Sequence, residues 1–127
     1  MNKTYTIELN GIILGTSMLE KADPSMGVVF GEIVILNNQI DYLFLKSFCE
    51  NNGIELASDY PEDKLISTTT IDPLKVTNSD GIVIKGIGNQ ISGMDSEGFE
   101  ISIEGIPYPF YEEEFPHHVR ESENKFK

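Results

Sequence analysis

The chain is short of cysteine, of long apolar runs and of positive charge, and each shortage excludes a class of protein. It has 127 residues, one cysteine, and nine lysines and arginines against 21 aspartates and glutamates. A single cysteine, Cys49, can form neither an intramolecular disulfide nor a cysteine zinc site. We expect Cys49 to be a small buried core residue rather than a reactive thiol, because no basic residue is an obvious partner.

No stretch of the sequence is apolar for long enough to span a bilayer, and residues 1–8 lack the features of a signal peptide. We therefore expect a cytoplasmic protein. The formal net charge of -12 disfavours direct binding to nucleic acid, which needs a basic surface, and binding to an anionic membrane. The same charge favours a basic protein as a partner, although acidity also serves solubility alone.

The length and a hydrophobic content of 39% fit a single globular domain over residues 1–127. Short alternating segments separated by turn residues predict an α+β fold. We expect a mainly antiparallel β-sheet of seven to nine strands built from hairpins, with one central helix at about residues 38–52 and a short C-terminal helix. Asn10 and Gly11 mark the first hairpin turn, because both residue types accept a positive φ.

Two apolar segments predict buried elements. Residues 28–36 are apolar almost throughout, which indicates a strand that is buried on both faces or is central in its sheet. The helix over residues 38–52 has Asn38 as a plausible N-cap and a glycine, Gly53, at its end. Its apolar stripe comprises Ile40, Leu43, Phe44, Phe48 and Cys49, widened by Tyr42 and Leu45.

The third quarter of the chain has the pattern of hairpins. Residues 78–81 form a turn, with residues 82–87 as the strand that returns from it, while residues 88–93 are ambiguous. After a further turn, residues 99–104 alternate clearly. Glu100 and Glu104 therefore share the face opposite the apolar side chains.

Residues 105–120 combine four aromatics, three prolines, three consecutive glutamates and both histidines of the chain. The prolines hold the backbone extended, so Tyr108 and Phe110 should face one way and Tyr111 roughly the other. Tyr108–Pro109 is a candidate for a cis peptide bond. Exposed aromatics bordered by carboxylates suit a surface that binds a protein.

Lysine and arginine are absent between Gly86 and Val119, whereas seven acidic residues fall in that stretch. We interpret the acidic and aromatic side chains there as one partner-binding surface. A solvated outer sheet face with glutamates at a helix start is the alternative. The predicted partner-binding residues are Asp95, Glu97, Glu100, Glu104, Tyr108, Phe110, Tyr111, Glu112, Glu113 and Glu114.

No motif for nucleophilic catalysis or for phosphate binding is present in the sequence. We predict no catalytic residues and no cofactor. Glu114 and His118 have the spacing of paired metal ligands on a helix, but a third ligand is not evident. We therefore predict no metal site, and a metal-dependent enzyme stays the least favoured alternative.

Two segments, residues 22–31 and 105–118, resemble small acidic bacterial proteins of polymorphic-toxin and contact-dependent-inhibition loci. They cover about a fifth of the chain. The resemblance implies an immunity protein: small, acidic, cytoplasmic and shaped to block a basic toxin domain. It implies no catalytic residue and little about architecture. A structural or self-associating domain, which includes a homodimer, is the other interpretation that the sequence leaves open.

Overall fold

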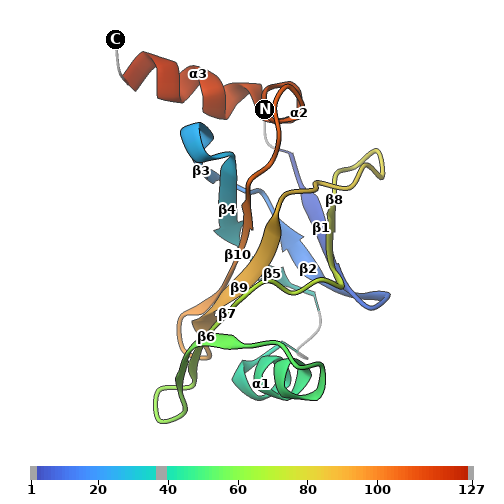
Figure 1. The fold of residues 1–127 in the computed structure, drawn as a ribbon, viewed down its shortest axis with the longest axis vertical. Coiled ribbons are helices and arrows are strands. Elements are labelled where there is room, and N and C mark those ends of the chain that lie inside the picture. The colour runs from blue at the N-terminus through green and yellow to red at the C-terminus, as the bar shows by residue number, and fades with distance from the viewer. Residues whose placement is uncertain (1–2, 37–39, 126–127) are drawn as a thin grey trace.

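A computed structural model describes residues 3–36 and 40–125 and shows an α+β fold (Figure 1). The strands are β1 (Tyr5–Leu9), β2 (Ile12–Ser17), β3 (Lys21–Asp23), β4 (Val28–Glu32), β5 (Val34–Ile35), β6 (Leu56–Tyr60), β7 (Leu65–Thr68), β8 (Leu74–Thr77), β9 (Gly88–Met94) and β10 (Gly98–Glu104). The helices are η1 (Pro24–Met26, a 3-10 turn), α1 (Tyr42–Asn51), α2 (Phe110–Glu114) and α3 (Pro116–Lys125). The described residues thus hold slightly more strands than the sequence predicts.

The strands form two antiparallel sheets around one hydrophobic core. The four-stranded sheet has the order β5-β2-β1-β8, and the six-stranded sheet has the order β3-β4-β10-β9-β7-β6. The chain crosses from the first sheet to the second between β2 and β3 and returns between β4 and β5. In Figure 1, α1 lies at one end of the molecule, and α2 and α3 lie at the other.

The first hairpin and the last strand confirm the prediction. Asn10 and Gly11 both have positive φ, at 50° and 83°, and they connect β1 to β2. In β10 the buried side chains are Phe99, Ile101 and Ile103, and the intervening positions face outward. The strict alternation of apolar and polar residues therefore correctly predicted a strand with one face covered by the core.

The prediction of a single strand buried on both faces at residues 28–36 is wrong, whereas the alternative of a central strand holds for β4, which lies between β3 and β10. This segment is divided between β4, in the six-stranded sheet, and β5, in the four-stranded sheet. Along β4, Val29 is buried, Val28 and Phe30 are half-buried, and Glu32 is exposed. One face of β4 is therefore left partly open, and Val28, Phe30 and Glu32 lie on it.

The prediction of a return strand at residues 82–87 is also wrong. Only one bridge, between Thr77 and Val83, connects this segment to β8. The Ile84 N–H donates to the Val76 carbonyl, whereas the Ile87 N–H donates to Glu104 of β10. The segment passes from one sheet to the other and pairs fully with neither. The ambiguous residues that follow are β9.

Helix α1 is shorter than predicted and its buried face is rotated. Asp41 is the N-cap, and its carboxylate accepts a hydrogen bond from the Phe44 N–H at 2.8 Å. The predicted N-cap, Asn38, lies outside the described residues. Leu43 is 63% exposed, so the predicted stripe is wrong at that position. Cys49 is buried as predicted, and burial raises the pKa of its thiol.

The single predicted C-terminal helix consists of two helices, α2 and α3, which are separated by Phe115. The Tyr108–Pro109 peptide bond is cis. None of the helices within residues 3–36 and 40–125 has the length and apolar character needed to cross a bilayer.

Candidate functional site

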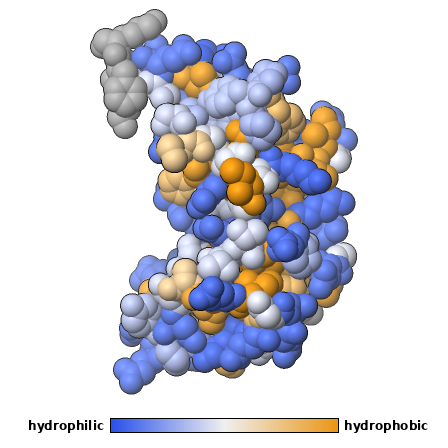
Figure 2. Space-filling view, viewed as in Figure 1, coloured by the Kyte–Doolittle hydropathy of each residue, from blue (hydrophilic) through white to orange (hydrophobic). Residues whose placement is uncertain are grey.

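The outer face of the six-stranded sheet carries a groove, which we call the acidic groove. It consists of two adjoining hollows of about 810 and 390 Å³ that share Glu20 and Lys21 in their lining. The first hollow lies between the strands and α3, and the second extends to the β9–β10 turn. Figure 2 shows the molecule indented on its left side, between α3 above and the strand turns below.

Carboxylates dominate the lining of the acidic groove. They are Glu20, Asp23, Glu32, Glu97, Glu100, Glu104 and Glu121. Lys21 is the one lysine or arginine among the described residues of this lining. Like charges held together on a half-open face repel one another, so the groove favours a cation or a basic protein surface.

Strand pairing explains how these side chains come together. Glu100 of β10 is paired with Glu32 of β4, and Ser102 is paired with Phe30. Phe30 is in turn paired with Lys21 of β3. Residues directly opposite each other in an antiparallel pair project from the same face of the sheet. The outer face therefore presents two neighbouring rows, one of carboxylates and one with an aromatic ring at its centre.

Three of the predicted carboxylates, Glu97, Glu100 and Glu104, line the acidic groove. Sequence reasoning missed the others because Glu20, Asp23 and Glu32 lie at β3 and on β4, far away in sequence, and Glu121 lies on α3, just beyond the stretch without lysine or arginine. The alternation of Val28, Phe30 and Glu32 is the signal that could have placed Glu32 on this face. No local pattern could have shown that β4 pairs with β10.

Asp95, in contrast, faces α1. Its carboxylate accepts a hydrogen bond from the Tyr42 N–H at 2.8 Å, at the start of that helix. A carboxylate at a helix N-terminus satisfies an unpaired N–H and offsets the helix dipole. Asp95 therefore ties the β9–β10 turn to α1, and we do not retain it in the partner-binding surface.

Glu114 is buried, with 8% of its surface exposed, and is hydrogen-bonded on both oxygens. Tyr5 donates to one oxygen at 2.9 Å and Asn78 donates to the other at 3.0 Å. Lys3 lies 3.4 Å from the carboxylate and donates to the Glu114 carbonyl at 2.8 Å. We call these four residues the Glu114 joint. Burial, followed by the hydrogen bond to Glu114, raises the pKa of Tyr5.

The predicted aromatic anchor is divided between the core and the surface. Tyr111 is fully buried and its hydroxyl donates to the Val28 carbonyl at 2.9 Å. Phe110 is half-buried against the core, and Tyr108 is 49% exposed. Glu112 and Glu113 are exposed on α2. Only Tyr108 of these three rings therefore presents a large part of its surface to solvent, and we do not retain Tyr111 or Glu114 in the partner-binding surface.

The two segments that carry the resemblance contact each other. The Tyr108 hydroxyl donates to the Pro24 carbonyl at 3.0 Å, and the Ile106 N–H donates to the Gly27 carbonyl at 2.9 Å. Gly27 has a φ of 67°, and a Cβ there would lie 2.7 Å from the Ile106 carbonyl oxygen. The glycine allows this close approach. Residues 22–31 and 105–118 thus build one structural unit beside the acidic groove.

The Glu114 and His118 pair that suggested a metal site has other partners. The His118 ring nitrogen Nε2 donates to the Leu19 carbonyl at 2.8 Å, and the ring is buried. Both carboxylate oxygens of Glu114 already accept hydrogen bonds, from Tyr5 and Asn78. Within residues 3–36 and 40–125, no three His, Cys, Asp or Glu side chains are grouped so that they could hold a metal ion. His118 instead fixes α3 against the bend before β3.

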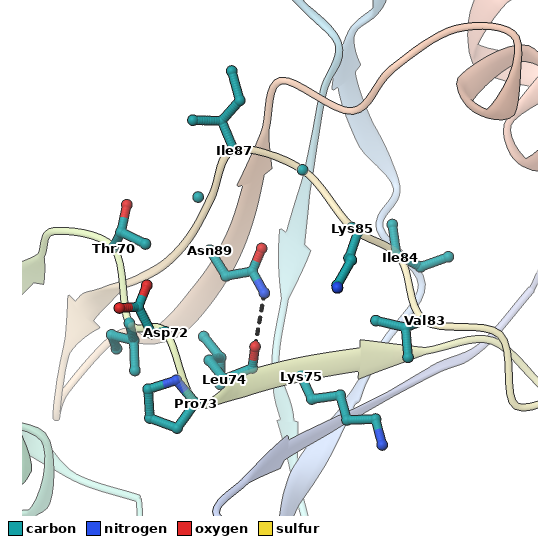
Figure 3. A pocket seen from close by; sticks show the side chains of 13 residues that line it. Thr70, Asp72, Pro73, Leu74, Lys75, Val83, Ile84, Lys85, Ile87 and Asn89 are labelled. Carbon is teal, nitrogen blue, oxygen red and sulfur yellow. Dashed lines mark hydrogen bonds between the residues drawn. The ribbon is translucent and has the colours of Figure 1, made fainter.

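A further cavity of about 340 Å³ lies between residues 70–75 and 83–89 (Figure 3). Lys85 points between the two segments, and Lys75 also belongs to the lining. Asn89 donates from its amide to the Leu74 carbonyl at 2.8 Å, which connects the two segments. Because two lysines and one aspartate line it, this cavity differs in charge from the acidic groove.

Comparisons of the chain with family models, with curated proteins and with solved structures found no match.

Proposed function

We propose that this protein binds a basic protein partner through the acidic groove. We further propose that it acts as an immunity protein of a polymorphic-toxin or contact-dependent-inhibition system, with the toxin domain as the partner. The observation that carries the proposal is the concentration of seven carboxylates against one lysine in the described lining of a single half-open groove. The resemblance of residues 22–31 and 105–118 to such proteins supports the choice of partner.

The groove carboxylates differ in how strongly the protein itself engages them. Glu100 pairs with Lys21, and Glu20 accepts a hydrogen bond from the Glu32 N–H. Among the described residues, the side chains of Glu32, Glu97 and Glu104 make no such contact. Carboxylates of this kind contribute little to folding and remain available for lysine and arginine side chains of a partner.

The proposed mechanism is occlusion. A toxin that acts on an anionic substrate, such as a nuclease, holds that substrate with lysine and arginine side chains. Pairing of these side chains with Glu97, Glu100 and Glu104 would deny the substrate its binding surface. Tyr108 lies in a neighbouring hollow that shares Pro24 and Ser122 with the groove lining, and it supplies an exposed ring at the margin of the interface. A stable interface of this type buries roughly 1,200–2,000 Å² in total.

Co-expression with the basic C-terminal domain of a secreted protein encoded beside this gene tests the proposal. The wild-type chain should restore growth and co-purify with that domain, whereas Glu100→Lys/Glu104→Lys should do neither. Glu55→Lys/Glu62→Lys is the matched control, because both residues are exposed and both lie outside the groove lining. Absence of such a neighbouring gene, or equal loss with the control, contradicts the proposal.

Self-association is the second candidate, and one observation favours it. Within the described residues, β5 is an edge strand of the four-stranded sheet. Val34 and the adjacent Leu36 are 60% and 61% exposed. An open edge with apolar side chains can pair with a second copy. Light scattering that gives a dimer mass, reduced to a monomer by Val34→Lys, would favour this candidate over the toxin partner.

A further inference from the structure

Lys21 lies in the middle of the acidic groove and contacts two of its residues. Its ammonium nitrogen Nζ is 3.1 Å from a carboxylate oxygen of Glu100 and 5.8 Å from the centre of the Phe30 ring. Phe30 lies on β4 and Glu100 lies on β10, so the two neighbouring strands together form a seat for a cation. An aromatic face beside a carboxylate is an arrangement that binds lysine and arginine side chains.

The contacts of Lys21 are weak enough to be exchanged. The side chains of Lys21 and Glu100 are 56% and 38% exposed, and exposed ion pairs contribute little to stability. An arginine would fit the same seat better. Its guanidinium is planar, stacks on aromatic rings, is less strongly hydrated than an ammonium and binds a carboxylate with two parallel hydrogen bonds.

We infer that Lys21 is an internal occupant of the seat at which an arginine side chain of the basic partner binds. This inference rests on the proposed function and deepens it. Lys21 lowers the affinity for the partner because it must be displaced, and the Phe30 ring makes the seat selective for guanidinium over ammonium. The acidic groove is therefore a recognition site for arginine in which a lysine of the same chain competes.

Departure of Lys21 from the seat leaves the surrounding carboxylates without a positive charge beside them. Glu32 is paired with Glu100 across the strands, and Glu20 reaches the Glu32 N–H at 3.0 Å. Three carboxylates therefore surround the seat, and no other lysine or arginine of the described lining is present to compensate for them. Removal of the lysine charge should make the groove bind arginine more tightly.

Isothermal titration with acetylated, amidated hexa-arginine and hexa-lysine peptides tests the inference. Lys21→Gln should bind hexa-arginine about fivefold more tightly than the control Lys75→Gln does. Both variants raise the net negative charge equally, and Lys75 lies outside the groove lining. Phe30→Leu should reduce the preference for hexa-arginine over hexa-lysine, with folding of each variant verified by circular dichroism.

The outcomes separate the inference from the proposed function. If Lys21→Gln and Lys75→Gln bind hexa-arginine equally, while Glu100→Gln/Glu104→Gln weakens binding, the inference is overturned and the groove remains the proposed partner-binding surface. If Phe30→Leu leaves the preference between the peptides unchanged, the selective role of the ring is wrong. If neither wild type nor Lys21→Gln binds hexa-arginine, both the inference and the proposed function are contradicted.

Discussion

The acidic groove and the Glu114 joint use the same functional group under opposite conditions. In the joint, one buried carboxylate receives hydrogen bonds from Tyr5 and Asn78 and lies beside Lys3. In the described lining of the groove, seven carboxylates share one lysine. A buried carboxylate needs donors to offset its lost hydration, whereas an exposed carboxylate is hydrated and needs none. The joint should therefore govern stability, and the groove should govern binding.

Adjacent positions on α2 show the same contrast. Glu113 is exposed, and Glu114, one residue later, is buried. Because successive helical residues project about 100° apart, one glutamate faces solvent and the next faces β1. Helix geometry alone therefore places one of these neighbouring glutamates in solvent and the other in the protein interior.

The largest expected effect is on the joint. Glu114→Ala should lower the free energy of unfolding by about 2–3 kcal/mol, because it leaves buried donors without an acceptor. Glu113→Ala should change it by less than about 0.5 kcal/mol. Urea unfolding followed by circular dichroism measures both. Similar losses of unfolding free energy in the two variants would contradict the distinction between buried and exposed glutamates.

A smaller effect is expected where residues 22–31 contact residues 105–118. Gly27→Ala should cost about 1–2 kcal/mol for the positive φ alone, with a further cost from the contact of its Cβ with the Ile106 carbonyl. Gly53→Ala is the matched control, because Gly53 also has a positive φ but a Cβ at that position would meet no heavy atom within 4 Å. Chemical denaturation of both variants measures the difference, and equal losses would show that the close approach does not matter.

Tyr5→Phe should lower the free energy of unfolding by about 1 kcal/mol near neutral pH, through loss of its hydrogen bond to Glu114. A double-mutant cycle with Glu114→Gln assigns this loss to the pair. Additive losses in the cycle would show that the two residues are not coupled.

The same tyrosine makes stability depend on alkaline pH. The pKa of Tyr5 is raised above its ordinary value, so above about pH 10 the unfolded chain releases the proton while the folded protein keeps it. The contribution of Tyr5 is complete below about pH 10 and falls by up to about 1.4 kcal/mol per pH unit above it. The free energy of unfolding should therefore fall less steeply with rising pH in Tyr5→Phe than in wild type.

The smallest effect is expected in the groove. Glu104→Gln should change the free energy of unfolding by less than about 0.5 kcal/mol, because its side chain is exposed. A stability loss comparable to that of Glu114→Ala would show that the groove carboxylates hold the fold together. Thermal unfolding at matched ionic strength is sufficient to distinguish the two.

Much of the local structure could be predicted because it depends on neighbouring residues. The alternation of residues 99–104 fixed the inward and outward faces of β10, and Asn10–Gly11 fixed the first turn. Residues 28–36 and 82–87 could not be assigned in the same way. Each segment passes between the two sheets. The apolar pattern of a strand does not indicate which sheet covers it.

The candidate site was predictable only in part for the same reason. Glu100 and Glu104 belong to one strand, so their shared face followed from periodicity. Glu20, Asp23 and Glu121 reach the groove through pairing and packing between segments that are distant in the chain. The burial of Glu114 depends on Tyr5 and Asn78, which no pattern near residue 114 indicates.

The most direct test measures partner affinity and stability in the same variants. The ligand for this test is the basic toxin domain proposed as the partner, and the variants are Glu100→Gln/Glu104→Gln and the control Glu55→Gln/Glu62→Gln. We predict that the groove variant loses at least about tenfold in affinity while its free energy of unfolding stays within about 0.5 kcal/mol of wild type. Equal affinity of the groove variant and the control, or a stability loss that accounts for the weaker binding, would contradict the central claim.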